Sequence, residues 1–415
     1  MFGIQILHEF EGASIGSSVW DGETLKVGLR KEPTCVADGR EHDYSIHFTF
    51  GLKNNSAERA SFRLEVEAGA GQRVLHEANF FAGSDPNRDL QIYPKQAQSD
   101  QFRFFTFSVS LQPGEQKIVS NTLMRSYTYL AERFRQLSEA GGAKGEVIGR
   151  SVEGRPISVY SWEGRGWRPE GPTLLITSGM HPPEPDTLAT EKIMEYVATP
   201  GGRESLDGFR LVVVPISNPD GFVHGYNGCN ARGINYFWDF RYQDEKNCPE
   251  AVALWRLVQK ISPWVYVDFH SYTIQGDRRK AGPYLKPNWF YQGSRWRALS
   301  ESIHQSLNSI PNTEPRFMYA PSSLSQLIVE RLNTISIAKY HLHLANGPDA
   351  CRELGLEVID RVVFCIRTHC EGGGTSFLFQ PYGKRSRNPF LVFPRQMKIE
   401  RSYWKRHLRK KRVYE

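Results

Sequence analysis

Three continuous runs of apolar residues constrain the fold of this chain more than any other feature. They read TLLITSG, LVVVPISN and WVYVDFHSY, and all of them lie after residue 145. Helical stretches such as EPDTLATEKIMEYVATP and PEAVALWRLVQKI alternate with them. A strand that is apolar on both faces must be covered on both faces. The alternation therefore predicts an α/β domain, in which helices flank a mixed sheet.

The first part of the chain has a different pattern. Short alternating segments such as YSIHFTFGLKN, SFRLEVEAG and FRFFTFSVSL are separated by Gly, Asn, Pro and Asp turns. This pattern predicts an antiparallel β-sandwich domain over residues 1–120. The segment SYTYLAERFRQLSEAGG has apolar residues at helical spacing and opens the second domain. We expect the α/β domain to span residues 121–383, followed by a basic tail at 384–415.

Composition fits an ordinary globular protein. The 415 residues are 40% hydrophobic and 23% charged, which is enough to bury a substantial core. The six cysteines are scattered without a Cys-x-x-Cys pair, as expected for a reducing compartment. The N-terminal segment lacks the apolar run of a signal peptide, and no stretch approaches the roughly 20 apolar residues of a membrane helix. We therefore expect a soluble, cytoplasmic protein without a membrane span.

Most of the formal net charge of +7 lies at the C-terminus. Residues 401–415 contain seven Lys or Arg and one Glu, so the rest of the chain is nearly neutral. The mixture of Tyr403 and Trp404 with basic residues is compatible with an anionic surface. No nucleic-acid-binding fold accompanies it, and we favour a helix that packs on the body through Tyr403, Trp404 and Leu408. Nucleic acid is therefore not an expected partner.

Candidate metal ligands follow two of the apolar strands. His181 and Glu184 come directly after TLLITSG, and His270 ends the strand WVYVDFHSY. In open α/β sheets, ligand sites gather at such strand ends. Two imidazoles and one carboxylate leave a tetrahedral zinc ion one open position for water, as in catalytic sites. The alternative is that His270 is a structural histidine paired with Asp268.

The order of the motifs resembles the zinc carboxypeptidase family. His-x-x-Glu is followed by Asn-Pro-Asp-Gly at 218–221 and then by a strand ending in Asp-x-His-Ser, and the match covers about residues 145–370. The all-β domain, the Tyr-rich helix and VIGRSVEGRPI are similar to the cytosolic subgroup, whose known members trim glutamates from protein tails. The resemblance implies one zinc ion per chain, held by His181, Glu184 and His270, and a hydrolase that activates water.

The substrate-binding segment departs from the family pattern. In the family, Gly-x-Asp-x-Asn-Arg supplies an Asn-Arg pair that grips the terminal carboxylate of the substrate. Here the segment at 233–238 reads GINYFW, so Phe237 and Trp238 replace that pair. Two aromatic rings cannot imitate a bidentate arginine. An arginine that often polarises the carbonyl falls on Gly228, and Arg232 is close enough to substitute.

We therefore expect Arg232, Asn235, Phe237 and Trp238 to line the substrate site. Packing in the core is the alternative for the two aromatic residues. The segment GDRRKAG places Arg278, Arg279 and Lys280 after the third ligand. We assign Arg278 to an acidic group of the substrate, although a solvated run of charges would explain the segment as well.

The position of the catalytic glutamate is also altered. Alignment of TISIAKYHLHL with the late strand of the family puts Tyr340 where that glutamate is expected, followed by His341 and His343. Glu371 in HCEGGG could reach the site from a Gly-rich loop, and Glu330 is a poorer candidate. We assign Glu371 and Tyr340 as candidate catalytic residues. Packing of Tyr340 on a half-buried strand, with the two histidines facing solvent, is the alternative.

The sequence thus predicts a zinc-dependent hydrolase of an amide or peptide bond with non-standard specificity. The expected partner is a peptide or an acylated small molecule, because the clamp for a C-terminal carboxylate is lost. The alternative is a catalytically impaired zinc-binding scaffold that acts as a binding module through an aromatic pocket and the basic tail.

Overall fold

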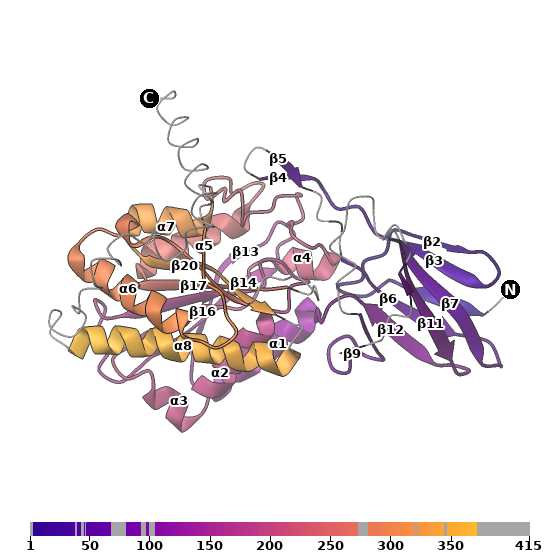
Figure 1. Cartoon of the computed structure of the whole chain (residues 1–415), viewed down its shortest axis with the longest axis horizontal. Helices are drawn as coiled ribbons and strands as arrows, with labels where there is room; N and C mark the ends of the chain where they lie inside the picture. Colours follow the sequence, from indigo (N-terminus) through magenta and orange to yellow (C-terminus); the bar gives the residue numbers. More distant parts are fainter. Residues whose placement is uncertain are drawn as a thin grey trace.

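The protein has two parts that lie side by side along its long axis (Figure 1). The computed structural model describes residues 3–37, 40–42, 45, 47–67, 80–92, 97–98, 104–272, 281–318, 320, 322–343 and 347–371, and at some strand and helix positions only their backbone. Arg278, Arg279, Lys280 and the basic tail lie outside the described residues.

The N-terminal part is a sandwich of two five-stranded sheets with the orders β1-β6-β12-β8-β9 and β10-β11-β7-β3-β2. Its strands are β1 (Ile4–Leu7), β2 (Ser17–Trp20), β3 (Thr24–Gly28), β6 (Thr49–Asn54), β7 (Ala60–Glu67), β8 (Phe81–Gly83), β9 (Gln91–Ile92), β10 (Ala97–Gln98), β11 (Phe104–Leu111) and β12 (Gln116–Ser120). β7 shows why they pack: Phe62, Leu64 and Val66 alternate inward with exposed residues. The pairs are antiparallel as predicted, except that β3 and β7 run parallel.

A mixed eight-stranded sheet forms the second part, with the order β13-β14-β16-β15-β17-β20-β18-β19. Its strands are β13 (Lys144–Arg150), β14 (Pro156–Glu163), β15 (Thr173–Thr177), β16 (Arg210–Val214), β17 (Val265–Tyr272), β18 (Gly282–Leu285), β19 (Arg316–Phe317) and β20 (Ile335–His343). The central strands β16, β15, β17 and β20 are parallel. β15 is buried along its whole length, which explains its continuous apolar sequence.

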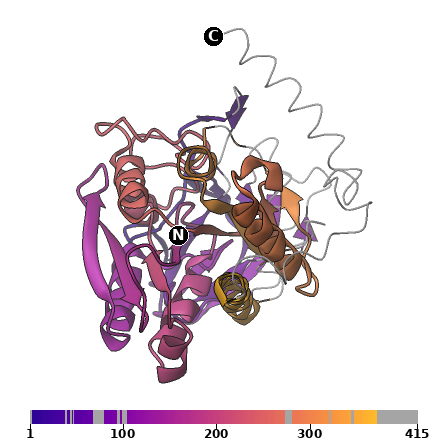
Figure 2. The ribbon, with the colours of Figure 1, turned by 90° about the vertical axis from the view of Figure 1, so that its left-hand side faces the viewer.

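Helices cover both faces of this sheet (Figure 2). They are α1 (Tyr127–Ala140), α2 (Thr187–Val197), α3 (Pro200–Glu204), α4 (Pro219–His224), α5 (Pro249–Ile261), η2 (Asn288–Phe290), α6 (Ser294–Asn308), α7 (Leu324–Leu332) and α8 (Pro348–Glu371). Buried residues of α1, α2, α6 and α8 share one hydrophobic cluster, and those of α5 and α7 share the cluster on the other face. The predicted α/β fold is confirmed. Within the described part of the chain, no helix combines the length and apolar character needed to cross a membrane.

Candidate metal centre

The loop between β15 and α2 carries the first two candidate ligands. Gly179 turns the chain after β15 with φ +64°, and a Cβ there would meet Pro215 O at 3.0 Å. His181 is 4% exposed, and the side chain of Glu184 is 18% exposed. The carboxylate of Asp186 accepts hydrogen bonds from the backbone N–H of Gly179 at 3.1 Å, which closes the loop. Burial raises the pKa of Asp186 well above its ordinary value.

The third candidate ligand comes from the neighbouring parallel strand. β17 pairs with β15 in a register that puts Asp268 opposite Thr177, so His270 emerges at the same edge of the sheet as the loop after β15. The side chain of His270 is completely buried. Residues that are far apart in the sequence meet here because the carboxyl ends of parallel strands lie at the same edge of the sheet.

The three side chains converge on one point. Nδ1 of His181 lies 3.1 Å from Oε1 of Glu184, and Nδ1 of His270 lies 2.8 Å from Oε2 of the same carboxylate. One donor atom from each of the three residues lies within 4.8 Å of the others. The backbone N–H of Ser271 also donates to Glu184 Oε2 at 3.0 Å and fixes the carboxylate. Two imidazole nitrogens and a carboxylate oxygen form the donor set of a zinc site with an open position.

The outer nitrogens of both imidazoles have oxygen partners. Nε2 of His181 lies 3.2 Å from Oδ1 of Asn235, and Nε2 of His270 lies 3.2 Å from Oδ2 of Asp268. Both partner atoms can only accept, as can the Glu184 oxygens that face each Nδ1. Metal coordination through Nδ1 would leave the proton of each imidazole on Nε2, which would donate it to Asn235 or Asp268. Thr177 Oγ1 donates to Asp268 Oδ1 at 2.6 Å and orients this carboxylate.

Two aromatic residues line the metal centre beside the imidazoles. The ring centroid of Phe237 lies 5.4 Å from that of His181 and 4.6 Å from that of His270, both edge to face. Trp238 packs on Phe237 with centroids 4.8 Å apart. Phe237 is 4% exposed, and it belongs to the hydrophobic cluster beneath α5 and α7. It therefore contacts the ligands and also extends the core.

Asn235 lies beside His181 and Phe237, and only the oxygen of its amide has hydrogen-bond partners among the described residues. Oδ1 also accepts from the backbone N–H of Phe237 at 3.3 Å. Nδ2 is buried and has no hydrogen-bond partner among the described residues. A buried amide N–H without a partner is costly, so this atom is a candidate donor to a bound group. Arg232 is exposed, and its backbone N–H donates to Asn230 Oδ1 at 3.0 Å.

The Asn-Pro-Asp-Gly motif has a structural role beside the centre. Asn218 caps α4 by accepting from Gly221 N, and its Nδ2 donates to Met180 O at 3.2 Å and to Cys229 O at 3.0 Å. The amide thus ties the residue before His181 to the loop that leads to Asn235. These contacts fix the positions of the two segments relative to each other.

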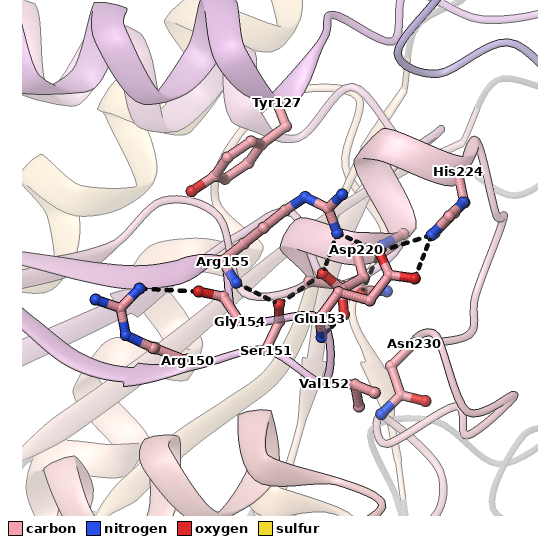
Figure 3. Close-up of polar contacts among 12 residues, drawn as sticks. Tyr127, Arg150, Ser151, Val152, Glu153, Gly154, Arg155, Asp220, His224 and Asn230 are labelled. Carbon is pink, nitrogen blue, oxygen red and sulfur yellow. Dashed lines mark hydrogen bonds and ion pairs between the residues drawn. The ribbon is translucent and has the colours of Figure 1, made fainter.

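Asp220 anchors the other side of α4 (Figure 3). Its completely buried carboxylate accepts from Ser151 Oγ at 2.5 Å, Glu153 N at 3.0 Å and Arg155 Nη1 at 2.6 Å. These donors come from the turn between β13 and β14, so the motif joins that hairpin to α4. His224, the last residue of the helix, contacts Glu153 at 2.8 Å.

Tyr340, one of the two predicted catalytic candidates, lies in the hydrophobic core. This side chain is completely buried against Phe269, with ring centroids 6.2 Å apart, and its hydroxyl has no hydrogen-bond partner among the described residues. Phe269 precedes His270 on β17, so strand alternation puts Tyr340 on the face opposite the metal centre. Burial raises the pKa of the Tyr340 hydroxyl, which further disfavours proton transfer.

The pairing of β20 with β17 is irregular beside Tyr340. Val267 pairs with Ile337, but Phe269 pairs with Tyr340, so β20 contains one extra residue at this point. The position in register with His270 is therefore His341. The side chains of His341, His343 and Glu371 lie outside the described part of the structure. Glu330 is exposed on α7 and accepts from Gln326 Nε2 at 2.8 Å.

The sheet order, the flanking helices and the His-Glu-His cluster at the carboxyl ends of parallel strands define an α/β protein with a candidate metal centre. Residues 136–274 match the family model described as zinc carboxypeptidase. This part of the chain is thus similar to the zinc carboxypeptidases, in agreement with the resemblance that the motifs indicated.

Solved structures share the fold over both parts of the chain. A metallo-carboxypeptidase from Burkholderia cenocepacia is 18% identical, with 88% of this chain and 99% of that chain covered and a TM-score of 0.70. A metallo-carboxypeptidase from Pseudomonas aeruginosa, in complex with (2-guanidinoethylmercapto)succinic acid, is 18% identical, with the same coverage and a TM-score of 0.66. The N-terminal sandwich is therefore a shared feature of these structures.

Proposed function

We propose that the chain is a zinc-dependent hydrolase of an amide or peptide bond, with one zinc ion held by His181, Glu184 and His270. The observation that carries this proposal is the convergence of two Nδ1 atoms on a single carboxylate, with both Nε2 atoms engaged behind them. When bound, zinc in such a site lowers the pKa of water toward ~7 and polarises a scissile carbonyl.

The residues of the chain supply orientation around the centre. Asn235 and Asp268 fix the tautomers of the two imidazoles through their oxygen atoms. Asn235 Nδ2 is then free to donate to an acceptor on the substrate, which would satisfy a buried group that lacks a partner. Exclusion of water by Phe237 strengthens these polar interactions.

We further propose that the substrate does not present a plain C-terminal amino acid. Phe237 and Trp238 occupy the positions of the Asn-Arg pair that grips a carboxylate in the family, and Phe237 contacts both imidazoles. An apolar ring at this place favours an uncharged or aromatic group next to the scissile bond. A peptide or acylated small molecule of that kind is the proposed substrate.

For the proton-transfer step we propose His341 in place of Tyr340. The support is its register position directly beside His270 on the adjacent strand. A neutral imidazole can take a proton from water and return it to the leaving amine near pH 7. Glu371 ends α8 and is retained as the second candidate.

We also propose that the chain belongs to the cytosolic carboxypeptidase subgroup and acts in the cytoplasm. The layout of a β-sandwich followed by the α/β domain supports the cytosolic carboxypeptidase subgroup. Five cysteines are free in the described residues, which supports a reducing, cytoplasmic environment.

Metal analysis and a substrate panel test the proposed function. Purified protein should contain one zinc ion per chain, and the His181→Ala variant should lose both zinc and turnover. The panel should contain acylated amino acids, peptides with free C-termini and amidated peptides, and turnover should favour those without a free carboxylate. Absence of turnover across the panel with zinc fully loaded would contradict the hydrolase.

The competing function is a zinc-binding scaffold that acts as a binding module, which the altered clamp at Phe237 and Trp238 favours. In that case deletion of residues 401–415 should abolish partner binding, whereas the His181→Ala variant should retain it. If the chain is a hydrolase, His181→Ala should abolish turnover, whereas deletion of residues 401–415 should not.

A further inference from the structure

We infer that the N-terminal domain supplies positioning residues for the metal centre, with Glu32 as the principal one. The inference rests on the metal site of the proposed function. The residues concerned are Arg30, Glu32 and Pro33, which we call the strap. After β3 ends at Gly28, the chain leaves the sandwich and runs past α4 to the hairpin of β4 (Cys35–Ala37) and β5 (Arg40–His42) (Figure 1).

Glu32 binds the backbone of the loop that follows α4. Glu32 is an acidic residue, yet it is buried and only 4% exposed. Oε1 accepts from the backbone N–H of Asn227, and Oε2 accepts from that of Gly228 at 3.4 Å. The backbone N–H of Glu32 is itself held by Ser45 Oγ at 2.8 Å. A buried carboxylate that accepts two backbone N–H groups fixes the loop more tightly than apolar packing does.

Arg30 and Pro33 bind the same loop on either side of Glu32. The guanidinium of Arg30 donates through Nη2 to His224 O and lies 4.8 Å from the ring centroid of Tyr226. Pro33 O accepts a weak hydrogen bond from Cys229 Sγ at 3.7 Å. Gly233 has φ +74°, and a Cβ there would approach Pro33 Cβ to 2.7 Å. The strap therefore packs closely against this loop, and Gly233 leaves the space that Pro33 needs.

The strapped loop leads directly to the residue behind His181. Cys229 O accepts from Asn218 Nδ2, which also holds the backbone before His181. Asn230 Oδ1 accepts from Ile234 N at 3.1 Å and closes the turn that ends at Asn235. Asn235 Oδ1 then contacts His181 Nε2. Only six residues separate Gly228 from Asn235, so a shift of the loop at the strap changes the orientation of this imidazole.

If Glu32 only attached the two domains to each other, loss of another contact between the domains should have the same effect as loss of Glu32. The chain offers a matched control for this alternative. Glu11, also in the N-terminal domain, accepts from Thr128 N at 2.8 Å and from Thr128 Oγ1 at 2.6 Å at the start of α1. It joins the same two domains through the same chemistry, but it contacts α1 and not the loop that leads to Asn235.

The test compares the Glu32→Gln and Glu11→Gln variants of the full chain. Zinc affinity is measured by chelator competition, the cobalt(II)-substituted proteins are compared by visible absorption, and hydrogen exchange is followed at residues 227–235. We expect Glu32→Gln to weaken zinc binding by about tenfold, to shift the cobalt spectrum and to speed exchange in the loop. Glu11→Gln should retain the affinity and the spectrum of the unmodified chain.

Equal zinc affinity and equal cobalt spectra in the unmodified chain and Glu32→Gln would overturn the positioning role. An equal loss in both variants would overturn it as well, in favour of domain attachment. If Glu32→Gln does not fold, Arg30→Gln provides the same comparison through the loss of its bond to His224 O. Failure of the unmodified chain to bind zinc would instead contradict the proposed function, so the two failures are distinguishable.

Discussion

Oδ1 of Asn235 lies 3.2 Å from Nε2 of His181, at the motif position where the zinc carboxypeptidase family has aspartate. A neutral amide therefore stands behind one imidazole, whereas the carboxylate of Asp268 stands behind the other. The two imidazoles therefore have chemically different partners at Nε2, one neutral and one acidic.

This asymmetry predicts the effect of substitutions at Asn235. Asn235→Ala should weaken zinc binding by about 10-fold or more, because His181 loses the acceptor that fixes its tautomer. Asn235→Asp should bind zinc at least as tightly as the unmodified chain. Chelator competition measures both affinities, and Asn308→Ala at the exposed end of α6 serves as the control. Unchanged affinity in Asn235→Ala would show that the contact does not orient the ligand.

Substitutions in β20 should separate packing from proton transfer. Tyr340→Phe removes a buried hydroxyl that has no partner among the described residues, so stability should stay the same or rise by about 1 kcal/mol. Zinc content and turnover should be retained. His341→Ala should keep zinc but lower kcat by about 100-fold or more. Chemical denaturation and steady-state kinetics provide the readouts, and loss of turnover in Tyr340→Phe would restore the tyrosine as a catalytic candidate.

Two buried histidines predict loss of stability in acid. Burial lowers the pKa of His47 to about 4 and that of His304 to about 3, from 6.5 in the unfolded chain. The unfolded state therefore binds more protons between pH 6.5 and 4, and the free energy of unfolding falls as the pH falls through this window. Each histidine contributes a slope of up to about 1.4 kcal/mol per pH unit.

Denaturant titrations of the metal-free protein from pH 7 to pH 4.5 measure this slope. His47→Gln should reduce it by the contribution of one proton, whereas substitution of the exposed His8 by Gln should leave it unchanged. His47 lies between Asn121 Oδ1 at 3.2 Å and Gly12 O at 3.3 Å, so its protonation acts where the sandwich meets the second domain. Equal slopes in all three proteins would exclude His47 as a source of the acid sensitivity.

The positions of Phe237 and Trp238 lead to a prediction of gained function. A double variant with Phe237→Asn and Trp238→Arg reinstates the family pair and should gain turnover of peptides with a free C-terminal carboxylate. The conservative variant Trp238→Phe should not show this gain. A folded, zinc-loaded double variant without the gain would mean that these two positions do not set specificity.

Local patterns in the sequence predicted much of the fold and the ligand set. The helix α1 was predicted from the helical spacing of its apolar residues, and the continuous apolar strands predicted a sheet covered by helices on both faces. His181, Glu184 and His270 were predicted because each follows a recognisable strand. The meeting of their side chains follows from parallel pairing, which puts strand ends at one edge.

Features that depend on register or on distant contacts were not predictable. The extra residue in β20 changes which residue is in register with His270, and apolar periodicity carries no signal for it. The role of Asn235 behind His181 was also missed, although the family motif places an acid there. The strap had no local signal at all, because Glu32 and its partners are about 195 residues apart in the chain.

This long separation has a consequence for how the protein is made. At ~5–20 residues per second, a ribosome needs roughly 10 to 40 s to deliver the loop after the strap has emerged. The sandwich has time to fold first and then offers Glu32 as a template onto which the later loop is fitted. The N-terminal domain would thus assist maturation of a site whose metal ligands it does not contain.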